Sequence, residues 1–144
     1  MEKLTELYRD LQGMGASLFT GNYGMSEGSD AAAVCVDGKY GIFLDIDRIR
    51  TVPQEVVSVS HEWAHAEYDA TYAVGADPLT KARAENRATK KQIERICPYD
   101  EMLDAMRRGY TTSYELAEQL TVTEEMIRKA YEYYTGPCGL SFSA

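Results

Sequence analysis

Hydrophobic and polar positions recur along the chain with periods that distinguish helices from strands. Residues 2–15 carry leucines and a tyrosine at helical spacing and stop at glycine, which is typical of an amphipathic helix. Residues 31–45 contain two apolar runs on either side of Asp37-Gly38, a dipeptide that readily adopts the positive φ angles of a two-residue turn. We therefore expect a first helix, a loop over residues 19–30 and an antiparallel β-hairpin.

Two longer helices are predicted in the middle of the chain. Thr51 has the character of an N-cap residue, so a helix should begin there and run to the glycine at position 75. Asp77 followed by Pro78 is a second helix start, and the pattern continues to residue 96. A short connection between two helices favours an antiparallel helical hairpin.

The C-terminal third predicts two more helices. Residues 111–134 show two short helical patterns, each opened by Ser or Thr with Glu soon after, and a tight turn joins them. This is the outline of a helix-turn-helix. The fold class expected for residues 1–144 is α+β in one domain, mostly helical, with a short hairpin or small sheet and a helix-turn-helix-like C-terminal pair.

Composition limits the environment and the partners. The chain is 44% hydrophobic and has a net charge of −8, which opposes a general affinity for nucleic acid or anionic lipid. The N-terminal residues form no signal peptide and no stretch is apolar enough to span a bilayer. Three widely spaced cysteines without a CxxC pair fit a reducing compartment. We expect a cytoplasmic protein without direct nucleic-acid or membrane partners.

The helix predicted after Thr51 holds both histidines of the chain. His61 and His65 lie about 40° apart around the helix axis, so both imidazoles point the same way. Glu62 lies about 100° from His61, close enough to lean over a metal ion without binding it. This is the HExxH arrangement, in which zinc accepts the two imidazoles and the glutamate acts as general base. The alternative is an ordinary helix with two partly exposed histidines.

A catalytic zinc site needs a third protein ligand, and no third histidine exists. Glu85 and His65 each lie about 11–12 Å from the predicted turn, measured along their helices, so the two residues can lie opposite each other in the helical hairpin. Glu85 also shares a stripe with Ala88, and a carboxylate that faces inward needs a cation. Glu85 is the favoured third ligand, and Cys97 is a softer alternative.

The motifs resemble those of a known family. "VSHEWAH", "AENRA", "IERICPYDEM" and "ELAEQLTVTEEMIRKAYEYY" together look like the ImmA/IrrE family of zinc metallopeptidases, over about residues 50–134. The resemblance implies a zincin-like, gluzincin-type domain in which His61, His65 and Glu85 bind Zn²⁺ and Glu62 is the catalytic base. Members of this kind are commonly encoded by phages or integrative elements beside a helix-turn-helix repressor that they cleave. A repressor is therefore the expected protein substrate.

The implied chemistry is attack of an activated water on a peptide bond, without an acyl-enzyme. Asp69 is a possible acceptor that orients His65, or an exposed residue. The sequence does not choose the group that stabilises the oxyanion beside the metal. The candidates are a backbone amide and the side chains of Tyr68, Tyr72, Arg87 and Tyr99.

Charge argues against DNA binding by the C-terminal helix pair. From Arg108 to Glu132 the chain has three basic and five acidic residues, so the net charge of this segment is −2. We expect it to be scaffold or a docking surface for the substrate protein, with contacts that include Tyr110, Tyr114, Leu116 and Leu120. The alternative function for the whole chain is a non-catalytic module that binds a regulator and has a structural metal or none.

Overall fold

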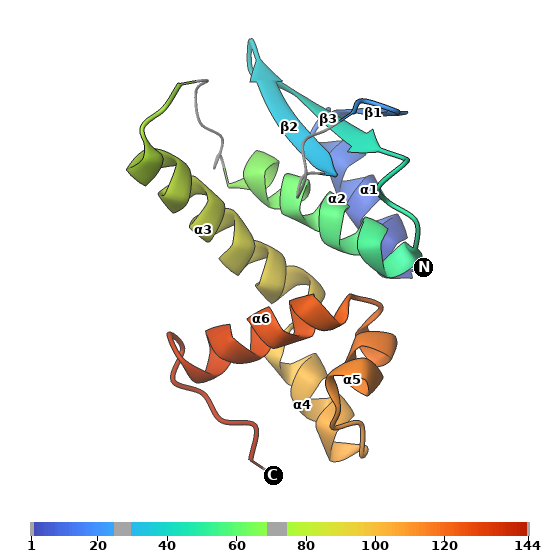
Figure 1. Cartoon of the computed structure of the whole chain (residues 1–144), viewed down its shortest axis with the longest axis vertical. Coiled ribbons are helices and arrows are strands. Elements are labelled where there is room, and N and C mark those ends of the chain that lie inside the picture. The colour runs from blue at the N-terminus through green and yellow to red at the C-terminus, as the bar shows by residue number, and fades with distance from the viewer. Residues whose placement is uncertain (1, 25–29, 69–74, 144) are drawn as a thin grey trace.

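The computed structural model describes residues 2–24, 30–68 and 75–143. Within these ranges the fold is α+β, with six helices and a three-stranded sheet, as the sequence predicts in outline. Figure 1 shows the sheet with α1 and α2 at one end, α4 to α6 at the other end, and α3 between them. The elements are α1 (Glu2–Gly13), β1 (Ser17–Gly21), β2 (Ala31–Val36), β3 (Lys39–Asp45), α2 (Val52–Glu67), α3 (Pro78–Ile96), α4 (Tyr99–Arg107), α5 (Ser113–Leu120) and α6 (Glu124–Thr135).

The small sheet has β3 in its middle. β2 and β3 form the predicted antiparallel hairpin, whose turn residues Asp37 and Gly38 have φ angles of 53° and 76°. β1 pairs parallel to β3, so the prediction of a loop beginning at residue 19 is wrong for its first residues. Buried and exposed residues alternate only weakly in β1. Its backbone pairs with residues distant in sequence, which a local pattern cannot reveal.

Helix α2 begins where the sequence predicts and ends earlier. The Thr51 side chain accepts a hydrogen bond from the Gln54 backbone, and the Gln54 side-chain oxygen accepts one from the Thr51 backbone, which completes a capping box. The helix ends at Glu67 rather than at Gly75. Tyr68 leaves helical geometry there, and its ring packs edge-on against Trp63.

Helix α3 agrees with the prediction over its whole length. Asp77 caps it by accepting a hydrogen bond from the Thr80 backbone, and it ends at Ile96. Val57 of α2 contacts Gln92, whereas His65, further along α2, contacts Glu85. The two helices therefore run antiparallel, and α2 presents its histidine face to α3.

The C-terminal helices form one continuous core with the rest of the described chain. Thr112 and Thr123 cap α5 and α6 as expected. Leu116 and Leu120 are 3% and 1% exposed, so their prediction as surface contacts is wrong; their helical spacing turns both into the core. Tyr114 remains on the surface at 60% exposure. In the three described ranges, no helix is both long and apolar enough to cross a membrane.

Lys3 ties the N-terminal helix to the C-terminal half. Its ammonium donates hydrogen bonds to the backbone carbonyls of Ile96 (2.6 Å) and Leu120 (2.7 Å), at the ends of α3 and α5. It also pairs with Glu101 at 3.3 Å. A cation at the carboxyl ends of two helices satisfies carbonyls that have no helical partner and complements both dipoles. Lys3 thereby helps to hold α3, which carries part of the site described below.

We expect Lys3→Met to lower the free energy of unfolding by about 2–3 kcal/mol, because two charge-assisted hydrogen bonds from a mostly buried ammonium are lost. Urea unfolding followed by the fluorescence of Trp63, the chain's one tryptophan, measures the change. The matched control is Lys129→Met, which removes an exposed pair with Glu125 and should cost less than about 0.5 kcal/mol. Equal effects of the two substitutions would contradict this role for Lys3.

Candidate metal centre

Three side chains from α2 and α3 converge in the structure. The Nε2 atom of His61 lies 2.9 Å from one carboxylate oxygen of Glu85, and the Nε2 atom of His65 lies 3.2 Å from the other. The two Nε2 atoms are 3.2 Å apart. Among the residues that the structure describes, these three form the group able to hold a metal ion, with ligand atoms all within 4.8 Å of one another. The convergence expected from the sequence is present.

The spacing fits a tetrahedral metal ion. Zinc–ligand bonds of about 2.0–2.1 Å place the ligand atoms of a tetrahedral site about 3.3–3.4 Å apart. The two Nε2 atoms are 3.2 Å apart, which is close to that value, and each of them lies within 3.2 Å of a different oxygen of the Glu85 carboxylate. Two imidazole nitrogens at 3.2 Å also need a proton or a cation between them, because their lone pairs otherwise repel. The donor set of two nitrogens and one carboxylate therefore suits a divalent cation such as zinc.

Glu85 differs from the sequence-based expectation in its burial. Its side chain is 43% exposed, so the expectation that Glu85 faces inward and therefore requires a cation is wrong. The residue lies at the rim of the stripe, one turn before the buried Ala88. Hydrogen bonds with His61 and His65 hold the pKa of Glu85 well below its usual range. Glu85 is thus an ionised carboxylate, which is the form that binds metal.

Glu62 is the buried carboxylate of the site. Its exposure is only 6%, although it neighbours His61 on the helix. Burial raises the pKa of Glu62 above its ordinary value in the metal-free protein; the two histidines oppose this shift, and the charges of Glu85 and Asp30 add to it. A carboxyl with a raised pKa beside a metal-ligand group has the properties of a general base. Glu62 is outside the converging set of three, as the HExxH geometry predicts.

Gln92 is a polar residue of the site that the sequence pattern left without a role. It is 2% exposed and lies on α3. Its amide nitrogen donates to the Val57 carbonyl at 2.7 Å and to the Ser60 hydroxyl at 3.1 Å. Its amide oxygen faces the Nδ1 atom of His61 at 3.4 Å. The role of Gln92 could have been predicted from its place on the stripe with Glu85 and Ala88, because a glutamine that faces the core needs buried hydrogen-bond partners.

Cysteine takes no part in the described cluster. Cys97 is fully buried in the core, where burial raises the pKa of its thiol to about 12. A thiol held protonated in this way is a poor metal ligand. Cys35 and Cys138 are exposed, and the group of potential ligands includes neither. The geometry therefore favours Glu85 over Cys97 as the third ligand.

Comparisons of the chain with protein-family models, with curated proteins and with solved structures find no match. The resemblance to ImmA/IrrE peptidases consequently stays a prediction that rests on the motifs.

The expected oxyanion-stabilising groups are only partly placed by the structure. The Tyr99 hydroxyl donates to the Ser141 carbonyl within a C-terminal aromatic cluster, so it is engaged elsewhere. The Tyr68 ring packs between Trp63 and the Lys91 ammonium. Arg87 is exposed on α3. Tyr72 and Asp69 lie outside the described residues.

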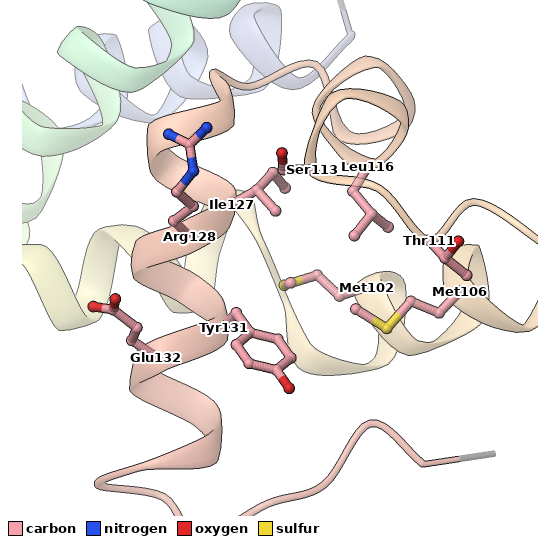
Figure 2. Close-up of a pocket in the computed structure, with 9 residues that line it drawn as sticks. All are labelled: Met102, Met106, Thr111, Ser113, Leu116, Ile127, Arg128, Tyr131 and Glu132. Atoms are coloured by element: carbon pink, nitrogen blue, oxygen red, sulfur yellow. The ribbon is translucent and has the colours of Figure 1, made fainter.

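A separate pocket of about 260 Å³ lies between α4, α5 and α6. Figure 2 shows Met102 and Met106 from α4 facing Tyr131 from α6, whereas Arg128 and Glu132 point away from its centre. The lining includes none of the converging ligands. The pocket is apolar and carries no group arranged for catalysis.

Proposed function

We propose that this chain is a zinc-dependent endopeptidase of a zincin-like type. The observation that carries the proposal is the convergence of His61, His65 and Glu85, whose ligand atoms all lie within 4.8 Å of one another, beside the buried Glu62. Three protein ligands leave a fourth position for water or substrate, which distinguishes catalytic zinc sites from structural ones. The HExxH spacing and the downstream glutamate, which resemble ImmA/IrrE peptidases, support the same reading.

The protein's own groups account for the proton transfers of peptide hydrolysis. Zinc, when bound, lowers the pKa of a bound water towards about 7 and polarises the scissile carbonyl. Glu62 accepts the proton of the attacking water and returns it to the leaving amine. His61 and His65 serve as neutral ligands through their Nε2 atoms, and Glu85 contributes one negative charge.

A non-catalytic module is the weaker alternative because it gives Glu62 no task. Burying a carboxylate raises its pKa and costs stability, so such a group is expected mainly where its chemistry is needed. A structural zinc site also closes its fourth position with a protein ligand, and the described cluster supplies three. The buried base therefore favours hydrolysis over docking alone.

The proposed substrate is a protein, and the motif resemblance favours a helix-turn-helix repressor of a phage or mobile element. β2 is one of the two outer strands of the sheet and packs against α2, so its edge suits an extended peptide segment. The hairpin partner β3, which contains "KYGIFLD", has a strand on both sides and has no free edge for a peptide.

Helix α6, the second of the helix-turn-helix-like pair α5 and α6, begins with Glu124 and Glu125. Their negative charges oppose binding to the phosphates of DNA.

Incubation with the protein encoded by the neighbouring gene, which we expect to be a helix-turn-helix repressor, tests the proposal. We expect the repressor to be cut at one or a few sites when zinc is present, and cleavage to stop with a chelator and return when zinc is added back. Mass spectrometry of the fragments identifies the bond. Cleavage that continues in chelator would show a metal-independent contaminant or mechanism, and an intact repressor under all conditions would remove this substrate from the proposal.

A further inference from the structure

We propose that Gln92 is a positioning residue that fixes the His61 ring so that its Nε2 atom faces the metal. The inference rests on the metal-binding part of the proposed function and does not require peptidase activity. It concerns a side chain outside the HExxH and E-x-x-A motifs, on the same helix as Glu85 and two turns further along. Gln92 has no expected part in the hydrolysis itself.

The hydrogen bonds of Gln92 determine which way its amide points. The nitrogen has two acceptors within reach, the Val57 carbonyl at 2.7 Å and the Ser60 hydroxyl at 3.1 Å. The reversed amide would place its oxygen against the Val57 carbonyl and against a Ser60 hydroxyl that already donates to that carbonyl, so acceptors would repel at both contacts. The amide oxygen must therefore face Nδ1 of His61, and the distance is 3.4 Å.

That orientation dictates the protonation of the imidazole. An amide oxygen only accepts hydrogen bonds, so Nδ1 of His61 must carry the proton that faces it. When a cation replaces the hydrogen bond between Nε2 and Glu85, the neutral imidazole keeps its proton on Nδ1 and presents the Nε2 lone pair to the metal, on the side of Glu85 and His65. A metal ion held by Nε2 stabilises the same arrangement. Gln92 thus selects the ligand tautomer and resists rotation of the ring about its Cβ–Cγ bond.

The arrangement also couples the two ligand helices. Gln92 reaches from α3 to the backbone of α2 at Val57, and Glu85 reaches from α3 to His65 near the other end of the contact. Gln92 is 2% exposed, and Ser60 beside it is fully buried and donates to the Val57 carbonyl. Water therefore does not replace the amide easily. The position of His61 is set by a fixed buried network and not by the ring's own packing alone.

Zinc titration of purified variants tests the role of the amide oxygen. Gln92→Met keeps the length of the side chain without an acceptor, and we expect about a tenfold to hundredfold loss of zinc affinity, the usual effect of removing a partner of a ligating histidine. Gln92→Glu keeps an acceptor oxygen and should bind zinc more tightly than Gln92→Met. Ser60→Ala removes one amide contact, leaves the oxygen in place and should have a smaller effect than Gln92→Met.

Nitrogen-15 NMR of the zinc-bound wild-type protein gives a test without any variant. The chain has two histidines, so the spectrum should resolve each ring. We expect His61 to be protonated at Nδ1 with a proton that exchanges slowly with water, and this signal to weaken or exchange faster in Gln92→Met. If Gln92 only stabilised the fold, Gln92→Met would lower the stability of the metal-free protein without changing this signal.

The outcomes separate the inference from the proposed function. Zinc binding that depends on Gln92, in a protein that cleaves nothing, would support the inference and contradict the peptidase. Wild-type zinc affinity in Gln92→Met, a rapidly exchanging Nδ1 proton in the wild type, or equal affinities of Gln92→Glu and Gln92→Met would each overturn the inference and leave the peptidase intact. A wild-type protein that binds no zinc would overturn both.

Discussion

Glu62→Gln should abolish hydrolysis while the protein still folds and binds zinc. The amide has the shape of the carboxyl group but cannot accept the proton of the attacking water, so the rate of cleavage should fall by more than about a hundredfold. Glu62 is outside the converging ligand set, so zinc affinity should change little. Because burial disfavours its charged form, the neutral amide should also leave stability equal or slightly higher. Cleavage rate, zinc stoichiometry and urea unfolding are measured on the same preparation.

Glu67→Gln is the matched control for this experiment. It makes the same chemical change on the same helix, at an exposed position outside the ligand group. We expect wild-type cleavage from this variant. If Glu62→Gln cleaves the substrate as fast as Glu67→Gln does, Glu62 is not the base and the mechanism proposed here is wrong.

The helices that carry the site were predictable because their start signals are local. Thr51 and Asp77 each cap a helix through a hydrogen bond within the next three residues, and such bonds are encoded by neighbouring residues alone. The four-residue spacing of His61 and His65 then fixes the direction of both rings. The ligand cluster followed from these features, together with an antiparallel pairing of the two helices.

The position of Glu85 opposite His65 was predicted correctly, but from a premise that the structure contradicts. The counting assumed that α2 reaches Gly75, whereas it ends at Glu67, only two residues after His65. Residues 69–74 lie outside the part of the chain that the structure describes. The contact arises instead from packing between α2 and α3, which places Val57 opposite Gln92. Sequence spacing alone could not have distinguished the two explanations.

Three other features depended on partners distant in sequence. β1 owes its strand conformation to β3, and no pattern within Ser17–Gly21 announces it. Helix α4 was not predicted: the preceding helix was expected to end at residue 96, and no element was assigned to residues 99–107. The exposure of Glu85 and the burial of Glu62 could not be read from the sequence, because burial is set by the sheet and α1 around α2. Such properties appear only once the elements are packed.

Glu85→Gln is expected to remove most of the zinc affinity. Zinc sites bind with about 10–16 kcal/mol, and an even share among four positions is about 3 kcal/mol for each, which corresponds to roughly a hundredfold in the dissociation constant. The amide oxygen is a weaker ligand than a carboxylate and brings no charge to offset that of the cation. Competition with a chromogenic chelator of known affinity measures the loss.

The control for this last prediction is Glu94→Gln on the same helix. Glu94 is exposed and pairs with Lys91 and Tyr133, away from the histidines, so its replacement should leave zinc affinity unchanged. Glu85→Gln and Glu62→Gln together separate two roles in the site. Glu85→Gln should lose the metal, whereas Glu62→Gln should keep the metal and lose only hydrolysis. If Glu85→Gln binds zinc as tightly as Glu94→Gln does, the carboxylate is not the third ligand. The 2.9 and 3.2 Å contacts would then be hydrogen bonds of the metal-free protein alone.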